Sequence, residues 1–485
     1  MNRRMVFYFL GQMFKVVAGL MCLPFIVSLI YKEQCMWSFL ISIAIALVVG
    51  VLLTIICKTS NSVIYAKEGF VIVALSWIAM SAVGALPFYI SGEIPSYVDA
   101  LFETISGFTT TGASILTDVE AMSRGLLFWR SFTHWVGGMG VLVFIMAIIP
   151  KMSDRSIHIL RAEMPGPIVG KLVPKARDTA KILYLIYIVM TVVEFIMLLC
   201  GGMPVFDSLV HAFGTAGTGG FGIMSDSITG YNSYLQWVIT VFMFLFGINF
   251  NLYYLILFKK PKIALKSEEL WVYVGIAVVA VTAITINIFP MYDSVGESLK
   301  HSAFQVASVI STTGFATTDF NLWPGFSKSI LLLLMFTGAC AGSTAGGFKL
   351  SRVVLLVKMI KCEIKKLIHP RAVVSVRFEG KKVDSPVLSS VGTYLALYGV
   401  CFVSVFLLLS IEKFDLETNL SAVFACFNNI GPGFGKVGPA ASYAEYSAFS
   451  KILLSIAMLF GRLEIYPLLF TLSPSTWTKK VRKVK

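Results

Sequence analysis

The sequence Phe108-Thr109-Thr110-Thr111-Gly112 decides how this chain folds, because three further segments follow the same plan. Each of the four runs from a small residue to a glycine twelve positions later, in surroundings rich in threonine, glycine and small side chains. They span residues 100–112, 208–220, 302–314 and 421–433, and their glycines lie about 100 residues apart. That period leaves room for a helix–loop–helix unit in each repeat, so we predict an internal fourfold repeat.

Composition places the chain in a membrane. Its 485 residues are 57% hydrophobic and their mean hydropathy is +0.81, which is too apolar for a soluble globular protein. Crossing the hydrocarbon core takes about 20 apolar residues, and ten stretches reach that length. They are residues 5–31, 36–57, 69–91, 125–149, 180–201, 232–258, 270–290, 327–357, 387–411 and 445–471. The first could instead be a signal peptide, but a small-residue cleavage site is missing, so we predict a span.

Loops on one side of the predicted spans carry nearly all of the lysine and arginine, and such loops stay in the cytoplasm. These basic segments are 3–4, 58–67, 151–177, 259–266, 352–382 and 479–485, while the loops between them carry mainly Asp and Glu. We therefore predict a multi-pass protein with both termini in the cytoplasm. The same distribution accounts for the net charge of +14, so the charge does not indicate a nucleic-acid partner.

The four glycine-ended segments are too short to cross the bilayer, and the charge alternation would fail if they crossed. Each is predicted to enter the membrane and return to the same side, with its tip lining an interior pathway. The predicted fold is an all-α integral membrane protein, with four helix–pore loop–helix units around a central pore and two additional N-terminal transmembrane helices. Its parts are an N-terminal extension (1–57), repeats at 69–150, 180–258, 270–360 and 387–471, and a basic cytoplasmic tail (472–485).

A pore can hold a bare cation by replacing the water that it loses with backbone carbonyl oxygens. Glycine permits the backbone angles that aim carbonyls at the axis, and a short helix ending at the tip adds the partial negative charge of its C-terminus. The alternative is that these glycines only allow close helix packing. We predict one cation filter, with the candidate residues Thr110, Thr111, Gly112, Thr218, Gly219, Gly220, Thr312, Thr313, Gly314, Asn429, Ile430, Gly431, Pro432 and Gly433.

Several segments closely resemble the filters of the Trk/Ktr/HKT potassium transporters, and the resemblance runs the length of the chain. They are Ser106–Ser114, His211–Phe213, Gly219–Phe221, Ser311–Phe315 and Asn428–Gly433. The two leading spans, together with residues 162–167 and 369–373, are similar to the TrkH branch. The resemblance implies uptake of K⁺ as the transported ion across a bacterial inner membrane, a homodimer with one pore per subunit, and a cytoplasmic nucleotide-binding partner similar to TrkA.

One departure from the family lies in the second tip. Gly214 and Gly217 stand where residues with hydroxyl side chains, such as serine, are expected. The carbonyl ring would remain intact, but the selectivity among K⁺, Rb⁺ and Na⁺ is left open by this departure.

The eighth apolar stretch is interrupted at residues 338–347 by a run of small residues, which has too little bulk for a stable helix facing lipid. This run resembles the family's intramembrane loop, which closes the pore beneath the filter; the alternative is close helix packing. Lys349 follows it, either in the pore or at the cytoplasmic edge. The candidate gate residues are Gly338, Gly342, Ser343, Thr344, Gly346, Gly347, Lys349 and Arg462.

Arg462 lies well inside the tenth apolar stretch, where a charge costs about 2.5–3.5 kcal/mol unless it faces water or a partner. We predict that it faces the pore below the filter. The alternative is a structural pair with Glu464 or another acid. Arg130, Glu194 and His134 also lie within spans, and for them packing or interfacial roles are favoured.

The sequence has no motif for enzymatic chemistry: it contains neither a glycine-rich phosphate loop nor a metal-binding His-x-x-Glu-His helix, and its eight cysteines show no C-x-x-C spacing. The leading hypothesis is therefore a gated, potassium-selective pathway driven by the membrane potential. Symport of K⁺ with Na⁺ or H⁺ stays open. An alternating-access carrier for a small solute is disfavoured, because it would show inverted repeats instead of four parallel ones.

Overall fold

The computed structural model describes residues 1–58, 66–140, 176–257 and 261–477. Over these residues the chain is mostly helical, as predicted, with one short antiparallel hairpin of β1 (Arg377–Phe378) and β2 (Lys381–Lys382). Three predicted features lie outside the described residues: nearly all of the basic segment 151–177, the whole of the motif at 162–167, and the tail from residue 478 onward.

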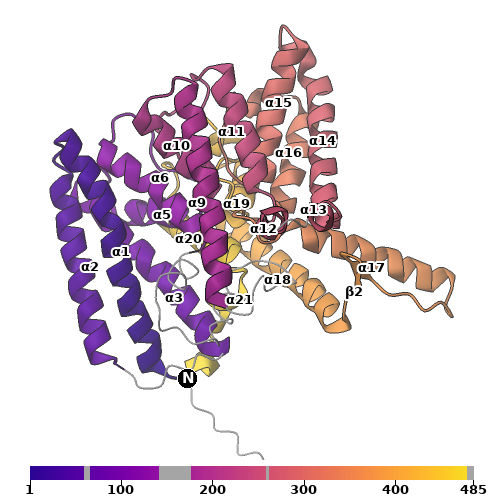
Figure 1. Ribbon diagram of the computed structural model, residues 1–485, viewed down its shortest axis with the longest axis horizontal. Helices are drawn as coiled ribbons and strands as arrows, with labels where there is room; N and C mark the ends of the chain where they lie inside the picture. Colours follow the sequence, from indigo (N-terminus) through magenta and orange to yellow (C-terminus); the bar gives the residue numbers. More distant parts are fainter. Residues whose placement is uncertain (59–65, 141–175, 258–260, 478–485) are drawn as a thin grey trace, which may run out of the picture.

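The two leading helices, α1 (Arg3–Tyr31) and α2 (Met36–Ile56), lie side by side at one edge of the molecule (Figure 1). They meet where Gly11 faces Gly50, and a Cβ atom on Gly11 would come within 2.9 Å of the Gly50 carbonyl oxygen. Such small residues let two backbones approach closely, which favours helix association in a bilayer. The start of α1 also meets the end of the chain, because Arg3 donates to the Trp477 carbonyl at 2.9 Å.

Among the described residues, six helical segments are long and apolar enough to cross a membrane, which agrees with several of the predicted spans. They are α1, α2, α3 (Ala66–Gly84) with α4 (Leu86–Ile90), α9 (Ala176–Cys200), α14 (Glu268–Ile288) with the 3₁₀ turn η2 (Phe289–Met291), and α18 (Ser385–Leu409). The described part of the predicted span at 125–149 is α6 (Arg124–Gly138).

Three stretches that the sequence predicts as spans are broken helices. They are α11 (Ser233–Phe246) with α12 (Phe250–Leu257), α16 (Gly325–Thr337) with α17 (Leu350–Ile368), and α20 (Ala448–Leu463) with α21 (Tyr466–Leu472). The first pair is bent by 91°. In the second pair, α17 runs across the direction of α16 and projects from the body (Figure 1). In the third, Glu464 and Ile465 both have positive φ, a conformation that ends a right-handed helix.

Four short helices alternate with the long ones along the chain. They are α5 (Tyr97–Phe108), α10 (Val205–Gly217), α15 (Val295–Ile310) and α19 (Leu416–Phe427). Each carries an acidic residue in its first turn, where the positive end of the helix dipole favours it: Asp99, Asp207, Glu297 and Glu417. Three also have a side-chain cap, from Ser96, Ser294 and Asp415. With 12 to 16 residues they are too short to cross a bilayer.

The remaining elements are short connectors on the ends of the helices. They are α13 (Pro261–Ala264), η3 (Phe320–Leu322), η4 (Gly435–Val437) and α22 (Pro474–Trp477). Buried and partly buried aromatic rings from α6, α9 and α10 pack beside the short helices; Phe132, Trp135 and Phe213, for example, lie with ring centroids 5.4–5.8 Å apart. This packing holds the short helices in place within the bundle.

Candidate functional site

All four short helices end in the same turn, although their sequences differ. Each short helix is followed, within two positions, by a residue in the left-handed conformation with φ of 54–57°. These left-handed residues are Thr110 after α5, Thr218 after α10, Thr312 after α15 and Asn429 after α19. In each case the next residue donates its N–H to a carbonyl five residues back, at 2.8–2.9 Å, as in Thr111 N to Ser106 O. This bond closes the helix end and turns the chain out of it.

Two residues beyond each left-handed residue is a glycine with positive φ. These ring glycines are Gly112, Gly220, Gly314 and Gly431, with φ of 79°, 78°, 88° and 97°. A Cβ atom on each ring glycine would collide with a carbonyl oxygen of the next tip. That oxygen belongs to Gly219 for Gly112, to Thr313 for Gly220 and to Ile430 for Gly314. On Gly431, the Cβ atom would lie 2.6 Å from the carbonyl oxygen of Thr111, in the first tip. The tips therefore meet in chain order and the last meets the first, so the four form a closed ring.

The ring corrects one detail of the sequence alignment. Counting twelve residues from Ser421 puts Gly433 in the fourth position, but the residue that has positive φ and meets the first tip is Gly431. Gly433 lies two residues further on, where its N–H donates to the Val437 carbonyl at 2.7 Å. The count fails because it starts from Ser421, whereas the residue twelve positions before Gly431 is Asn419, which is not a small residue. The turn geometry identifies the equivalent positions, and a count of residues does not.

Side chains around the ring bond locally or to a neighbouring tip. Thr109 and Thr111 share a hydrogen bond at 2.8 Å, and Ser311 and Thr313 share one at 2.7 Å. The amide of Asn429, which takes the place of threonine in the fourth tip, donates to Thr111 Oγ1 at 2.9 Å. Because these side chains bond with one another, the backbone carbonyls are left as the groups that neighbouring tips present to one another.

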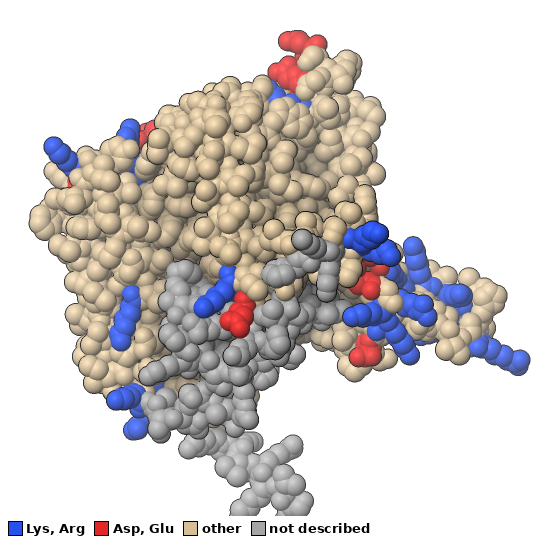
Figure 2. All heavy atoms as spheres, in the orientation of Figure 1, with Lys and Arg blue, Asp and Glu red and all other residues tan. Residues whose placement is uncertain are grey.

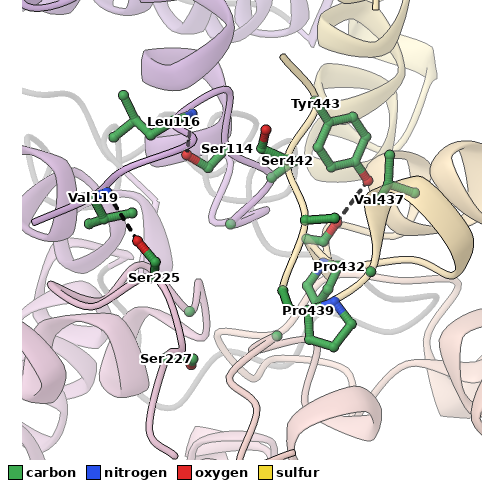
Figure 3. A pocket seen from close by; sticks show the side chains of 18 of the residues that line it. Ser114, Leu116, Val119, Ser225, Ser227, Pro432, Val437, Pro439, Ser442 and Tyr443 are labelled. Carbon is green, nitrogen blue, oxygen red and sulfur yellow. Dashed lines mark hydrogen bonds between the residues drawn. The ribbon is translucent and has the colours of Figure 1, made fainter. Parts of the chain in front are cut away.

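A cavity of about 420 Å³ lies against one face of the ring, and all four ring glycines line it (Figure 3). The extended segments that follow the tips form its walls. Ser225 accepts a hydrogen bond from Val119 N at 3.2 Å, and Tyr443 donates to the Gly431 carbonyl at 2.8 Å while its N–H donates to Ser114 O. These contacts tie the first tip to the second and the fourth to the first.

A buried ion pair supports the cavity wall. Arg130 Nε donates to Glu103 Oε1 at 2.5 Å, and the other carboxylate oxygen accepts the Ile115 N–H at 2.9 Å. Arg130 also donates to the Gly222 carbonyl and lies over the Phe221 ring, 3.9 Å from its centroid. The pair thus links α5 and α6 to the segments that leave the first and second tips. This agrees with the packing role predicted for Arg130; Glu103 was not singled out, although an acid inside a short apolar helix was a signal for it.

His134 and Glu194 are both fully buried near the second tip or its helix. His134 Nδ1 lies 2.7 Å from the Gly107 carbonyl oxygen, and its ring packs on Phe221 with 4.2 Å between centroids. These contacts fit the predicted packing role of His134. Within the described part of the chain, no group of three or more His, Cys, Asp and Glu side chains is arranged to hold a metal ion.

Residues 338–349, between α16 and α17, form a compact loop on the opposite face of the ring from the cavity. Gly346 N donates to Thr312 Oγ1 at 2.7 Å, which joins the loop to the third tip. Gly338 packs directly on Gly347, where a Cβ atom would be 3.1 Å from the Gly347 Cα. The small residues therefore bring the two ends of the loop together. They do not pack one helix against another, as the alternative interpretation of the sequence proposed.

The break between α11 and α12 holds the 338–349 loop from the side. Cys340 N donates to the Gly247 carbonyl at 3.1 Å, and Phe250 N donates to the Gly342 carbonyl at 3.0 Å. Thr344 Oγ1 donates to the Phe246 carbonyl at 3.2 Å. This support was not predicted, because the stretch 232–258 is largely apolar and only Asn249 and Asn251 mark the position of the break.

Arg462 lies between the ring and the 338–349 loop. Its guanidinium donates to Thr110 Oγ1 at 3.2 Å, to the Thr344 carbonyl at 2.8 Å, and to the Gly137 and Gly138 carbonyls at the end of α6 at 2.5 and 2.6 Å. Glu464, which the sequence offers as an alternative partner for Arg462, pairs with Arg352 at 2.7 Å. One side chain thus joins the first tip, the loop and the C-terminus of α6.

Lys349, the other basic candidate, folds back on its own loop. Its side chain is buried and Nζ donates to the Ala345 carbonyl, so it does not lie at an exposed cytoplasmic edge. The candidate gate residues from Gly338 to Lys349 are therefore brought together with Arg462 on one face of the ring.

Apolar helices of membrane-spanning length, together with a ring of four short helix ends, indicate a multi-pass membrane transport protein. The family model for TrkH, described as a cation transport protein, matches residues 36–270 and 252–479. The chain therefore belongs to the TrkH family, which is a family of transporters and not of enzymes.

Three known relatives cover nearly the whole chain. It is 35% identical to the Trk system potassium uptake protein TrkH of Salmonella typhimurium over 98% of this chain and 100% of the relative. It is 36% identical to the Trk system potassium uptake protein TrkG of Escherichia coli, over 94% of each. The crystal structure of the potassium transporter TrkH from Vibrio parahaemolyticus is 31% identical, with a TM-score of 0.89 over 99% of this chain and 100% of that one.

Proposed function

We propose that this chain takes up potassium ions across the bacterial inner membrane, through a channel-like pore whose filter is the ring of four loop tips. The observation that carries the proposal is the closure of the ring, in which each ring glycine touches the carbonyl that precedes the ring glycine of the next tip. The printed names of the relatives, which are potassium uptake proteins, support potassium as the substrate.

The ring suits a cation because a backbone carbonyl oxygen lies at each junction between tips, and such oxygens can replace the water that a potassium ion sheds. The four short helices end at the ring, and the partial negative charge of their C-terminal ends favours a cation there. The cavity lined by the ring glycines serves as the entrance. In this proposal the conducting residues are those from Thr110, Thr218, Thr312 and Asn429 to the ring glycines, and Pro432 and Gly433 lie just outside them.

The 338–349 loop and Arg462 form the proposed gate on the other side of the filter. The loop contacts the third tip through Thr312, and Arg462 contacts the first tip through Thr110. A cation about 4 Å from the guanidinium would be repelled by about 4 kcal/mol at an effective dielectric of 20. Passage therefore requires the loop, the charge, or both to move.

The proposed orientation places both termini and α17 in the cytoplasm. The hydrogen bond from Arg3 to Trp477 supports a common side for both ends of the described chain. Lysine and arginine side chains gather over α17 and the β-hairpin (Figure 2). Basic residues prefer cytoplasmic segments, so this cluster supports a cytoplasmic position for both elements. The repeat boundaries at 69–150, 180–258, 270–360 and 387–471 are part of the same proposal, as is a homodimer with one pore per subunit.

A TrkA-like nucleotide-binding ring is the proposed regulator. Its proposed docking surface is the basic segment 358–386, which covers the end of α17 and the β-hairpin, together with 150–179, which lies almost entirely outside the described residues. Binding of the purified ring that weakens as salt rises, with flux that responds to nucleotide, is the expected result. Salt-independent binding and a flux that ignores nucleotide would remove this partner.

The experiment that tests the function is uptake of radioactive Rb⁺ into liposomes that contain the purified chain. Uptake driven by membrane potential alone, and inhibited by K⁺ more than by Na⁺, is expected for a potassium-selective pore. Uptake that requires a Na⁺ or H⁺ gradient would favour symport. Uptake that saturates with a small organic solute and ignores K⁺ would favour an alternating-access carrier.

A further inference from the structure

Glu269, the second residue of α14, reaches the 338–349 loop from outside it. The side chain is buried, with 5% of its surface exposed. Its Oε1 atom accepts the Ala341 N–H at 2.8 Å and the Ser351 N–H at 3.1 Å. Ala341 lies in the first half of the loop, and Ser351 is the second residue of α17. One carboxylate oxygen therefore bridges the chain on both sides of the loop.

The N-terminus of α17 needs an acceptor that its own cap does not supply. The first N–H groups of a helix have no partner inside the helix and are usually satisfied by the side chain of the capping residue. Here the capping residue is Lys349, which has φ of 77° and no acceptor in its side chain. A carboxylate suits this position, because the positive end of the helix dipole attracts it. Glu269 therefore caps the N-terminus of α17 by accepting the Ser351 N–H.

We propose that Glu269 is a positioning residue that latches the 338–349 loop in its closed position beneath the ring; the proposal rests on the gate described under the proposed function. The loop can swing only if it separates from the third tip, from α14, from the α11–α12 break and from Arg462. Of these supports, Glu269 is the one that also bonds to the helix leaving the loop. Loss of its acceptor oxygen removes one bond on each side of the loop at once.

The latch is joined to the cytoplasmic β-hairpin by direct contacts. Glu379, at the turn of the hairpin, accepts the Ser267 hydroxyl at 2.8 Å and the Glu269 N–H at 3.2 Å through its own Oε1. Lys358 of α17 donates to the Arg377 carbonyl at 2.7 Å and pairs with Glu268. The hairpin and α17 are thereby clamped to the first turn of α14, next to Glu269. A protein that pulled the hairpin away from α14 would act on the latch directly.

The test is resting Rb⁺ uptake by liposomes with the chain alone, comparing Glu269→Ala and Glu269→Gln with the parent protein. Glu269→Ala removes the acceptor, so resting uptake should rise about tenfold, which corresponds to about 1.4 kcal/mol. Glu269→Gln keeps a carbonyl oxygen in the same place and should stay within about twofold of the parent. Asp293→Ala, which removes an exposed acid in the turn before α15, is the control and should leave uptake unchanged.

Hydrogen exchange supplies a second readout that does not depend on flux. In Glu269→Ala the amides of Ala341 and Ser351 should lose protection, while the amides at the ring, such as Gly219, should keep it. Folded Glu269→Ala with parental uptake and parental protection overturns the proposal, and so does a rise in uptake that Glu269→Gln shares in full. If Glu269→Ala does not fold, the test passes to Glu269→Gln. Loss of hydrogen-exchange protection at the Ala341 and Ser351 amides in that variant would overturn the proposal.

The failure of the latch and the failure of the proposed function give different results. A variant lacking residues 341–346 shows whether the loop limits flux at all. If that deletion raises uptake while Glu269→Ala does not, the loop is a gate and the latch proposal alone fails. If neither the parent nor the deletion variant takes up Rb⁺, the proposed function itself fails.

Discussion

The ring of tips and the 338–349 loop lie against each other, but they are built in different ways. The ring has four parts with the same turn, and backbone groups hold it: each tip is closed by an N–H to carbonyl bond and packs on the next through glycine. The loop exists once. Backbone bonds join it to the α11–α12 break, and its other contacts with the rest of the molecule are made through single side chains, among them Glu269, Thr344 and Arg462.

This difference indicates which part can move. A tip cannot leave the ring without losing its glycine contacts with both neighbouring tips. The loop contacts are individual hydrogen bonds worth about 0.5–3 kcal/mol each, and exchanging a few of them can produce a second, populated state. This difference in bonding supports the proposal that the ring is a fixed filter and the loop a movable gate.

The largest effect is expected in the ring. Replacing Gly431 with serine forces an L-residue into positive φ, at about 1–2 kcal/mol, and brings a Cβ to the Thr111 carbonyl. We expect the preference for K⁺ over Na⁺ to fall by at least about tenfold in liposome flux measurements. The same result is expected for Gly112, Gly220 and Gly314.

Gly433→Ser is the matched control for Gly431→Ser. Gly433 lies in the same segment without positive φ, and a Cβ there would meet Ser421 and Val437 instead of a neighbouring tip. We expect some loss of thermal stability but parental ion preference. The opposite result would be a loss of selectivity in Gly433→Ser together with parental selectivity in Gly431→Ser. It would show that Gly433, as the twelve-residue spacing predicts, and not Gly431, belongs to the filter.

The next effect is expected from the loop. Deleting residues 341–346 removes the bonds from Gly346 to Thr312 and from Arg462 to Thr344. Resting Rb⁺ uptake should rise by about tenfold to a hundredfold, because two or three hydrogen bonds of the closed state are lost. The order of ion preference should not change. A deletion that alters ion preference as strongly as a ring mutation would contradict the separation of filter and gate.

Arg462→Ala should have a smaller effect on resting uptake than the deletion. It removes the positive charge and one loop contact but leaves the 338–349 loop in the path, so uptake should rise by only about tenfold, less than the loss of the full repulsion would give. The comparison is Arg462→Lys, which keeps the charge but cannot reach four acceptors at once. If the charge limits flux, the lysine variant stays near the parent; if only the bonds matter, both variants rise together. Loss of folded protein in both would assign Arg462 to structure alone, through the Gly137 and Gly138 carbonyls.

The smallest effect is expected from Asn429→Thr, which gives the fourth tip the residue type of the other three. Asparagine tolerates the left-handed conformation better than threonine, and its amide donates to Thr111 Oγ1 and the Met458 carbonyl. We expect a loss of about 1–2 kcal/mol of stability, visible as a lower thermal midpoint in detergent, with ion preference retained. A changed ion preference without a change in midpoint would instead put this side chain in the ion path.

Much of the site could be predicted from residue types alone. Three of the four tips were aligned correctly because Thr-x-Gly recurs at one spacing, as in Thr110 to Gly112. The fourth was misaligned because Asn429-Ile430-Gly431-Pro432-Gly433 offers two glycines, and spacing cannot tell which of them has positive φ. Glu269 was not predicted, since an acid at the start of a predicted span normally only marks the membrane edge.

The sequence by itself determined that the chain is a helical membrane protein with four short, glycine-ended segments, because apolar length and residue type act locally along the chain. The tertiary structure decided what closes the ring and what holds the loop, since those contacts join residues far apart in the sequence. Thr111 and Asn429, for example, are hydrogen bonded across 318 positions, and Glu269 and Ser351 across 82. No local pattern records such a pairing, because it depends on how the separate helices pack against one another.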